Sequence, residues 1–153
     1  MGGTVVVQVG QCGNAVGTHF WQHVSQELQS HGVSHLGGLV EELEGVKGTS
    51  HSFRARCVLV DTEPKAVRNA QADGLLKGAT AVCGQSGRGN NWAHGYRQPG
   101  ELGGGIDRGM DEGACLARAL EGVRASLERG GGADLLVLHS LAGGSGSGLG
   151  SRL

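Results

Sequence analysis

An apolar run over residues 135–140, LLVLHS, leads directly into the segment 141–148, LAGGSGSG, which is built mainly from glycine and serine. Glycine has no Cβ atom, so the backbone N–H groups of such a loop can turn inward around an anion. A helix that followed the loop would add the positive end of its dipole. The pattern therefore predicts a phosphate-binding loop at the end of a strand. A flexible Gly/Ser turn is the alternative.

Two common nucleotide-binding motifs are absent from this loop. No Lys follows the glycines, so the loop lacks the GxxxxGK[ST] spacing of a Walker A motif. The glycines also do not have the GxGxxG spacing of a dinucleotide-binding fold. A phosphate site here would have to belong to another class of nucleotide-binding protein.

Three further strand-like runs are each followed by polar, acidic or glycine-bearing residues. They cover residues 4–9, 55–60 and 80–83, and the segments after them are GQCGN, DTEP and GQSGRGNNW. In an open parallel sheet, ligands bind outside the carboxyl ends of the strands. Several such loops at one edge of a sheet indicate a ligand site more specifically than one loop does.

Helices are expected between the strands, over residues 14–29, directly after Pro64, and over residues 106–128. The alternation predicts an α/β fold, a Rossmann-like parallel sheet with flanking helices. Residues 30–52 are expected to form a long surface loop. Each long helix has an apolar stripe predicted to face the sheet: Val16, Phe20, Val24 and Leu28 in the first, and Met110, Ala114, Ala117, Leu120, Val123 and Leu127 in the last.

Asp61 and Glu63 follow a strand at positions i and i+2, so both carboxylates can point toward the same edge. Carboxylates suit Mg²⁺ or its bound waters. A solvated acidic turn is the alternative. The pairs His19/His23 and His31/His35 have metal-ligand spacing, but the HExxH motif is absent and we do not expect them to bind metal.

Composition excludes several classes of partner. The net charge of −1 predicts no attraction to nucleic acid or to an anionic membrane. No apolar run reaches the length of about 18 residues that a membrane span needs, and no signal peptide is visible. The four cysteines form no CxxC pair, which argues against a zinc site.

With 31 glycines and 3% aromatic residues, the chain has few large apolar groups for its core.

Four segments together resemble the tubulin family. GQCGNAVG at 10–17, VLVDTEP at 58–64, GQSGRGNNWA at 84–93 and AGGSGSG at 142–148 occur in the order of the family's nucleotide loops. Ala142 and Ser145 stand where the family signature GGGTGSG has Gly and Thr, and Arg88 stands where the family usually has a small residue. The resemblance extends from about residue 4 to residue 150.

The resemblance implies GTP and Mg²⁺ as cofactors. It implies Glu63 as the metal-binding residue, with Asp61 beside it. For Cys12 alone, a small buried thiol would be the simpler interpretation, and the Arg88 side chain is expected to point into water. The nucleotide-binding residues implied by the motifs are Gln11, Cys12, Gly89, Asn90, Ser140, Ala142, Gly143, Gly144, Ser145, Gly146, Ser147 and Gly148.

Lys65 and Ala142 are similar to the delta branch of the family, delta-tubulin. That branch implies a place in the cytoplasm and the microtubule cytoskeleton, with a role in centriole, basal body and cilium assembly. The implied partners are other tubulin subunits or microtubule and centriole components, with no nucleic acid and no membrane.

We expect residues 1–153 to form a partial tubulin GTP-binding domain, an N-terminal fragment that lacks the remainder of the domain and the later domains. No catalytic residue is expected, and GTPase activity would need the full-length assembly. The strand at 135–140 is expected at an unpaired edge, where an apolar strand favours aggregation. Two other functions stay open: a stand-alone Rossmann-type nucleotide-dependent enzyme, for which Asp61 fits but the glycine spacing does not, and a nucleotide-free interaction module with relic motifs.

Overall fold

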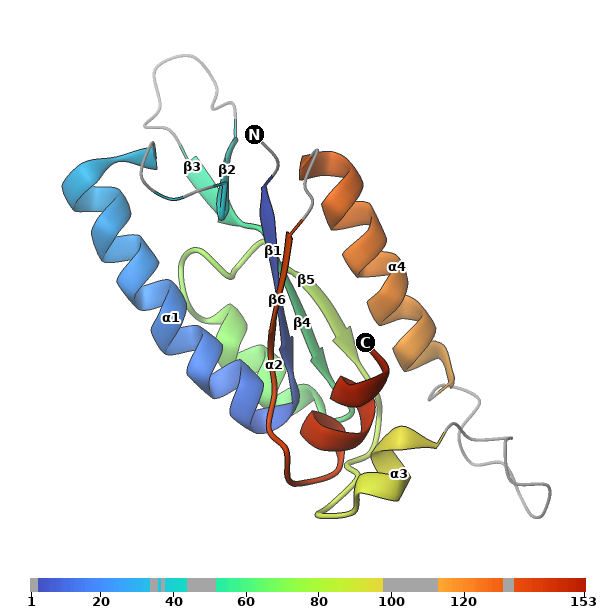
Figure 1. The fold of residues 1–153 in the computed structure, drawn as a ribbon. Coiled ribbons are helices and arrows are strands. Elements are labelled where there is room, and N and C mark those ends of the chain that lie inside the picture. The colour runs from blue at the N-terminus through green and yellow to red at the C-terminus, as the bar shows by residue number, and fades with distance from the viewer. Residues whose placement is uncertain (1–2, 34–35, 37, 44–51, 98–112, 131–133) are drawn as a thin grey trace.

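A computed structural model describes the chain apart from residues 1–2, 34–35, 37, 44–51, 98–112 and 131–133. Its centre is a four-stranded parallel sheet in the order β5-β4-β1-β6 (Figure 1). The strands are β1 (Thr4–Val9), β4 (Cys57–Asp61), β5 (Thr80–Cys83) and β6 (Asp134–Leu138). The predicted parallel α/β sheet is confirmed, with β1 and β4 at its centre.

Helices cover both faces of the sheet (Figure 1). On one face lie α1 (Gly10–His31) and α2 (Pro64–Gln71), which bury Trp21 and Val67 against Leu59. On the other face lies α4 (Gly113–Gly130), which packs on β1, β4 and β5. Such two-sided burial explains the continuous apolar runs of β1 and β4, because both faces of a parallel strand are covered.

The start of α1 differs from the prediction. The helix begins at Gly10, immediately after β1, rather than at Asn14. Gly10 has φ +74°, a left-handed conformation that favours glycine. A single residue therefore turns the chain from strand to helix, and the first predicted loop becomes the first turn of α1.

The prediction of a long surface loop over residues 30–52 is wrong in part. Its described portion contains β2 (Val40–Leu43), which pairs antiparallel with β3 (Ser52–Ala55). An ion pair between Glu41 and Arg54, directly opposite each other, joins the two strands. The Gly- and Ser-rich composition concealed these short strands, whose pairing depends on a distant segment. Residues 44–51 lie outside the described residues.

The predicted stripe on α1 is partly wrong. Val24 is buried, and Phe20 and Leu28 pack against the core, but Val16 is 52% exposed. The residues that α1 buries most deeply near the sheet include Gly13, Asn14 and Gly17, together with Trp21. The missing side chains of Gly13 and Gly17 let the helix backbone come close to Leu138 and Gln8 of the sheet, a feature that apolar periodicity does not detect.

The predicted stripe on α4 is also displaced. Leu120 is 45% exposed and Ala117 is exposed, whereas Cys115, Leu116 and Ala119 are buried. Val123 and Leu127 pack partly against the core as predicted. Gly122 lies so close to the sheet that a Cβ atom there would be 3.1 Å from Thr80 Cγ2. Met110 falls outside the described residues.

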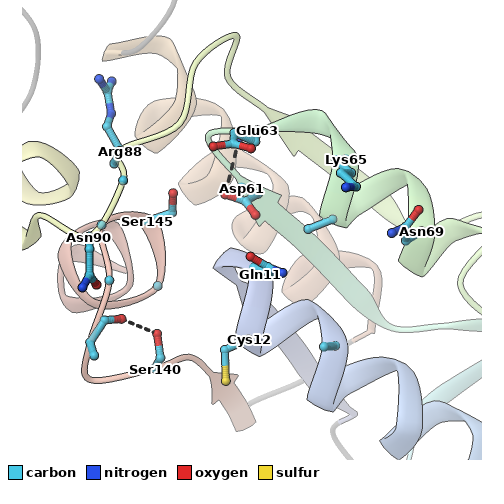
Figure 2. A pocket seen from close by; sticks show the side chains of 17 residues that line it. Gln11, Cys12, Asp61, Glu63, Lys65, Asn69, Arg88, Asn90, Ser140 and Ser145 are labelled. Carbon is cyan, nitrogen blue, oxygen red and sulfur yellow. Dashed lines mark hydrogen bonds between the residues drawn. The ribbon is translucent and has the colours of Figure 1, made fainter.

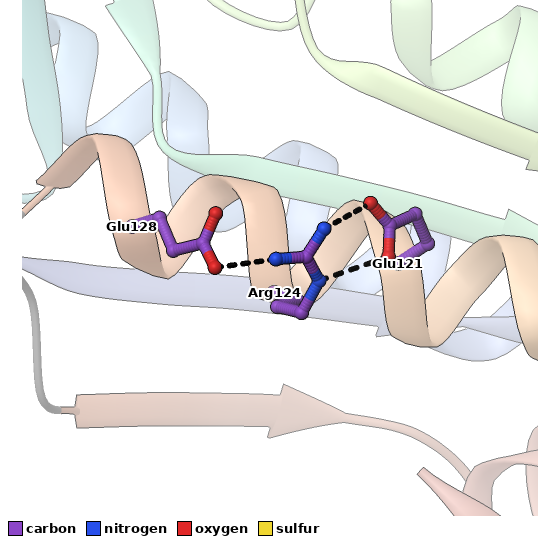
Figure 3. Close-up of polar contacts among 3 residues, drawn as sticks. All are labelled: Glu121, Arg124 and Glu128. Carbon is purple, nitrogen blue, oxygen red and sulfur yellow. Dashed lines mark hydrogen bonds and ion pairs between the residues drawn. The ribbon is translucent and has the colours of Figure 1, made fainter.

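The outward face of α4 is charged. Arg124 binds Glu121 through two hydrogen bonds, Nη2–Oε1 at 2.6 Å and Nε–Oε2 at 2.9 Å, and binds Glu128 one turn further on (Figure 3). Exposed ion pairs of this kind contribute little stability, about 0–1 kcal/mol. They mark the face of α4 that contacts water, opposite the buried residues Cys115 and Ala119.

Among the described strands, β6 lies at the edge of the sheet and pairs only with β1, as expected. Leu135 and Leu136 on this strand are 47% and 38% exposed. We predict that Leu135→Lys lowers the aggregation of the protein, because a charged side chain blocks edge-to-edge pairing. Light scattering against concentration measures the effect. Leu141→Lys is the control, because Leu141 is 93% exposed but lies outside any strand; equal improvement by both variants would contradict the role of the edge.

Candidate functional site

A cavity of about 770 Å³ opens at the carboxyl ends of β1, β4 and β6. Its volume is within the range of small-molecule sites, roughly 300–1,000 Å³. Nearly all predicted site residues line it: Gln11, Cys12, Asp61, Glu63, Gly89, Asn90, Ser140, Ala142, Gly143, Gly144, Ser145 and Gly146. Ser147 and Gly148 do not line it, and both are buried.

The loop after β6 is folded tightly. Gly143 has φ +89°, and the N–H of Gly144 donates to the carbonyl of Gly89 at 2.9 Å. A π-helical turn, η2 (Ser145–Leu149), begins within the loop and continues into the 3₁₀ turn η3 (Gly150–Arg152). The first N–H groups of a helical turn lack intrahelical partners and attract anions. The helical segment therefore starts inside the expected phosphate loop rather than after it.

The beginning of α1 touches this loop. A Cβ atom on Gly10 would lie 2.6 Å from the backbone nitrogen of Gly146, closer than real Cβ contacts occur. The approach therefore needs both the positive φ of Gly10 and its missing side chain. It brings Gln11 and Cys12 of α1 beside the Gly/Ser loop. The Cys12 side chain is exposed, so the simpler interpretation as a buried thiol is wrong.

A short helix that the sequence reading missed supports the loop from its other side. The helix α3 (Trp92–Tyr96) packs against η2. Asn91 caps it by accepting hydrogen bonds from the N–H groups of Ala93 and His94. Asn is a favoured N-cap residue, so this signal was present in the sequence.

The acidic pair lies between α1 and the Gly/Ser loop. Figure 2 shows Asp61 near Gln11 and Ser145, with Glu63 next to Asp61 on the side away from Gln11. Asp61 is 4% exposed, and burial raises the pKa of its carboxyl. Hydrogen bonds from the Ser145 hydroxyl and from the backbone N–H groups of Glu63 and Thr62 lower that pKa and oppose the effect. Glu63 is exposed, so the pair combines one buried and one accessible carboxylate.

These carboxylates suit a magnesium ion that arrives with a phosphate ligand. Among the described residues, no group of three or more His, Cys, Asp and Glu side chains could hold a metal by itself. Mg²⁺ is usually held by one or two protein carboxylates together with phosphates and waters. Asp61 and Glu63 meet that requirement. His19 and His31 are instead engaged locally, with Gln22 at 3.1 Å and Glu27 at 3.0 Å.

Two cationic residues, Lys65 and Arg88, also line the cavity. Lys65 lies four residues before Asn69 on α2, and both of these residues line the cavity. The sequence reading missed this contribution, although Pro64 marks the helix start and the i,i+4 spacing puts both residues on one face. Arg88 lines the opposite side, and its guanidinium extends away from the acidic pair (Figure 2).

Thr62 is a further residue that the sequence reading missed. Its hydroxyl oxygen is 2.6 Å from the Ser145 hydroxyl oxygen, which connects the end of β4 to the Gly/Ser loop. No motif signals this contact, because the two residues are 83 positions apart. Only the fold brings them together.

None of the helices in the described parts of the chain has the length and apolar character needed to cross a membrane.

Comparison with known proteins shows which family this chain resembles. The family model for the Tubulin/FtsZ family, GTPase domain, matches residues 4–153. The tubulin beta chains of Pyropia yezoensis and Porphyra purpurea are each 36% identical over 166 residues, which cover 97% of this chain and 32% of the relative. The nucleomorph tubulin beta chain of Guillardia theta is 35% identical over 165 residues, with 97% and 33% covered. The chain spans about a third of the length of these curated relatives.

Gly10→Ala tests the contact between α1 and the loop. A side chain at Gly10 would meet the backbone of Gly146, and its left-handed φ costs a non-glycine residue about 1–3 kcal/mol. We expect a clear drop in the thermal unfolding midpoint. Gly74→Ala is the matched control, because a Cβ atom there meets nothing within 4 Å. Equal unfolding midpoints for the two variants would contradict a close approach at Gly10.

Proposed function

We propose that this chain, which belongs to the Tubulin/FtsZ family of GTPase domains, binds GTP with Mg²⁺ in the cavity at the carboxyl edge of its sheet. The observation that carries the proposal is the convergence of segments after β1, β4, β5 and β6 on one cavity. The chain provides backbone N–H groups, polar side chains and two carboxylates there. These are the groups that a metal-bound nucleoside triphosphate needs.

The Gly/Ser loop would hold the phosphates. Its segment from Ala142 to Gly146 lines the cavity, and the first turn of η2 adds N–H groups that suit an anion. Ser145 contributes a hydroxyl in the same place. Gln11 and Asn90 would add amide groups from α1 and from the segment before α3. Ser140 donates its hydroxyl to the carbonyl of Ala142 at 2.6 Å, and so stiffens the entry to the loop.

Glu63 and Asp61 would hold the magnesium ion. A bound Mg²⁺ would neutralise charge on the phosphates, and these two carboxylates would fix its position. The described lining of the cavity consists mainly of groups suited to phosphate and metal. The proposed preference for guanine therefore rests on family membership rather than on the lining residues.

The proposal extends to the cellular role of the protein. Similarity to tubulin beta chains supports a place in the microtubule cytoskeleton, with other tubulin subunits as partners. Lys65 and Ala142 favour a delta-like member that acts in centriole, basal body and cilium assembly. We assign no catalytic residue within the chain, and hydrolysis is proposed only for the assembled protein.

Nucleotide competition tests the ligand. We expect unlabelled GTP to displace a labelled GTP probe at much lower concentration than ATP does, in buffer with Mg²⁺. The displacement curves give the two affinities directly. If ATP displaced the probe as efficiently as GTP, the guanine preference would be wrong, and a nucleotide-dependent enzyme of another class would become the better interpretation.

Glu63→Ala tests the metal site. The variant should weaken GTP binding in Mg²⁺ and change it little in EDTA, because the carboxylate acts through the cation. Arg88→Ala is the companion variant at the same cavity and should change neither affinity much, since its side chain extends away from the acidic pair. A Glu63→Ala loss of equal size with and without Mg²⁺ would remove Glu63 from the metal site.

A further inference from the structure

The contact between Thr62 and Ser145 connects the metal side of the cavity to the phosphate side. Thr62 follows Asp61 at the end of β4 and is 5% exposed. Its hydroxyl oxygen lies 2.6 Å from that of Ser145, which lines the cavity.

Ser145 has a second partner in Asp61, whose carboxyl it binds through its hydroxyl. A hydroxyl has one donor hydrogen and can also accept, whereas an ionised carboxylate only accepts. Because a hydroxyl can donate and accept at the same time, Ser145 can donate toward the Asp61 carboxyl while it accepts from the Thr62 hydroxyl. The Thr62 hydroxyl thus fixes the position of the Ser145 oxygen without using the Ser145 hydrogen.

The backbone around Thr62 is rigid enough to act as a support. The N–H of Gly84, directly after β5, donates to the carbonyl of Asp61 at 2.9 Å. A Cβ atom on Gly84 would lie 2.8 Å from the carbonyl oxygen of Thr62, so the two segments are in close contact. The Gly/Ser loop is held from its other side, by the hydrogen bond from the N–H of Gly144 to the carbonyl of Gly89. The buried Thr62 hydroxyl therefore joins two ordered segments and fixes the Ser145 hydroxyl between them.

We propose that Thr62 is a positioning residue for nucleotide binding, whose hydroxyl holds the Ser145 hydroxyl oxygen between the acidic pair and the phosphate position. The inference rests on the proposed GTP site and adds a residue to it. When a metal-bound phosphate occupies the cavity, the Ser145 hydrogen can turn from Asp61 toward a phosphate oxygen. Thr62 keeps the Ser145 oxygen in place in both arrangements, so the metal and phosphate halves of the site form one unit.

A double-mutant cycle in the whole chain tests this coupling. Thr62→Val removes the hydroxyl with little change of shape, and Ser145→Ala removes its partner. We expect Thr62→Val to weaken GTP binding about two- to tenfold in Mg²⁺, the size of a typical net hydrogen bond. In the Ser145→Ala background the same substitution should have almost no effect, because the contact is already absent.

Two further variants separate positioning from general stability. Thr62→Ser keeps a hydroxyl and should restore most of the affinity. Thr80→Val removes a hydroxyl at the opposite end of the sheet, at the start of β5, and should leave GTP binding unchanged. Thermal unfolding without nucleotide, measured for each variant, shows whether the protein remains folded.

The inference is overturned if Thr62→Val weakens binding equally in the Ser145 and Ser145→Ala backgrounds, or if it leaves the affinity unchanged. It is also overturned if Thr62→Ser binds as weakly as Thr62→Val. Absence of GTP binding by the unsubstituted protein is a different result. It would contradict the proposed function first, and this inference would fall with it.

Discussion

The close approach of Gly10 to the backbone of Gly146 is the constraint on which the site depends. The positive φ of Gly10 lets α1 begin directly after β1, and its missing side chain brings the start of that helix against the Gly/Ser loop that follows β6. A side chain at Gly10 would separate the two segments. Parallel pairing of β1 with both β4 and β6 then places the Asp61 carboxylate at the same edge. Three distant parts of the chain thereby form one cavity.

Burial and hydrogen bonding have opposite effects on the charge of Asp61 in that cavity. Asp61 is almost fully buried, which raises its pKa, yet the Ser145 hydroxyl and two backbone N–H groups stabilise its charge. The exposed Glu63 beside it carries the second carboxylate. Similarity to tubulin beta chains over nearly the whole length of this chain agrees with such a site.

The strands and their loops could be predicted from the sequence because each signal is local. The strand-like runs at residues 4–9 and 80–83 predicted β1 and β5 with the observed bounds, and residues of the polar segments after them lie at the cavity. The faces of α1 and α4 could not be predicted in the same way. Both helices also approach the sheet through small residues such as Gly17 and Gly122, which apolar periodicity does not detect, whereas Val16 and Leu120 of the predicted stripes are exposed. The hydrogen bond between Thr62 and Ser145 has no local signal, since it depends on the register of the whole sheet.

The central claim is that the cavity binds GTP with Mg²⁺ when the chain is folded. Thermal unfolding of the purified protein at increasing GTP concentration, in the presence of Mg²⁺, tests it most directly. A ligand that binds only the folded state raises the unfolding midpoint as its concentration exceeds the dissociation constant. The account predicts a progressive rise with GTP that is smaller in EDTA. An unchanged midpoint up to millimolar GTP would contradict it.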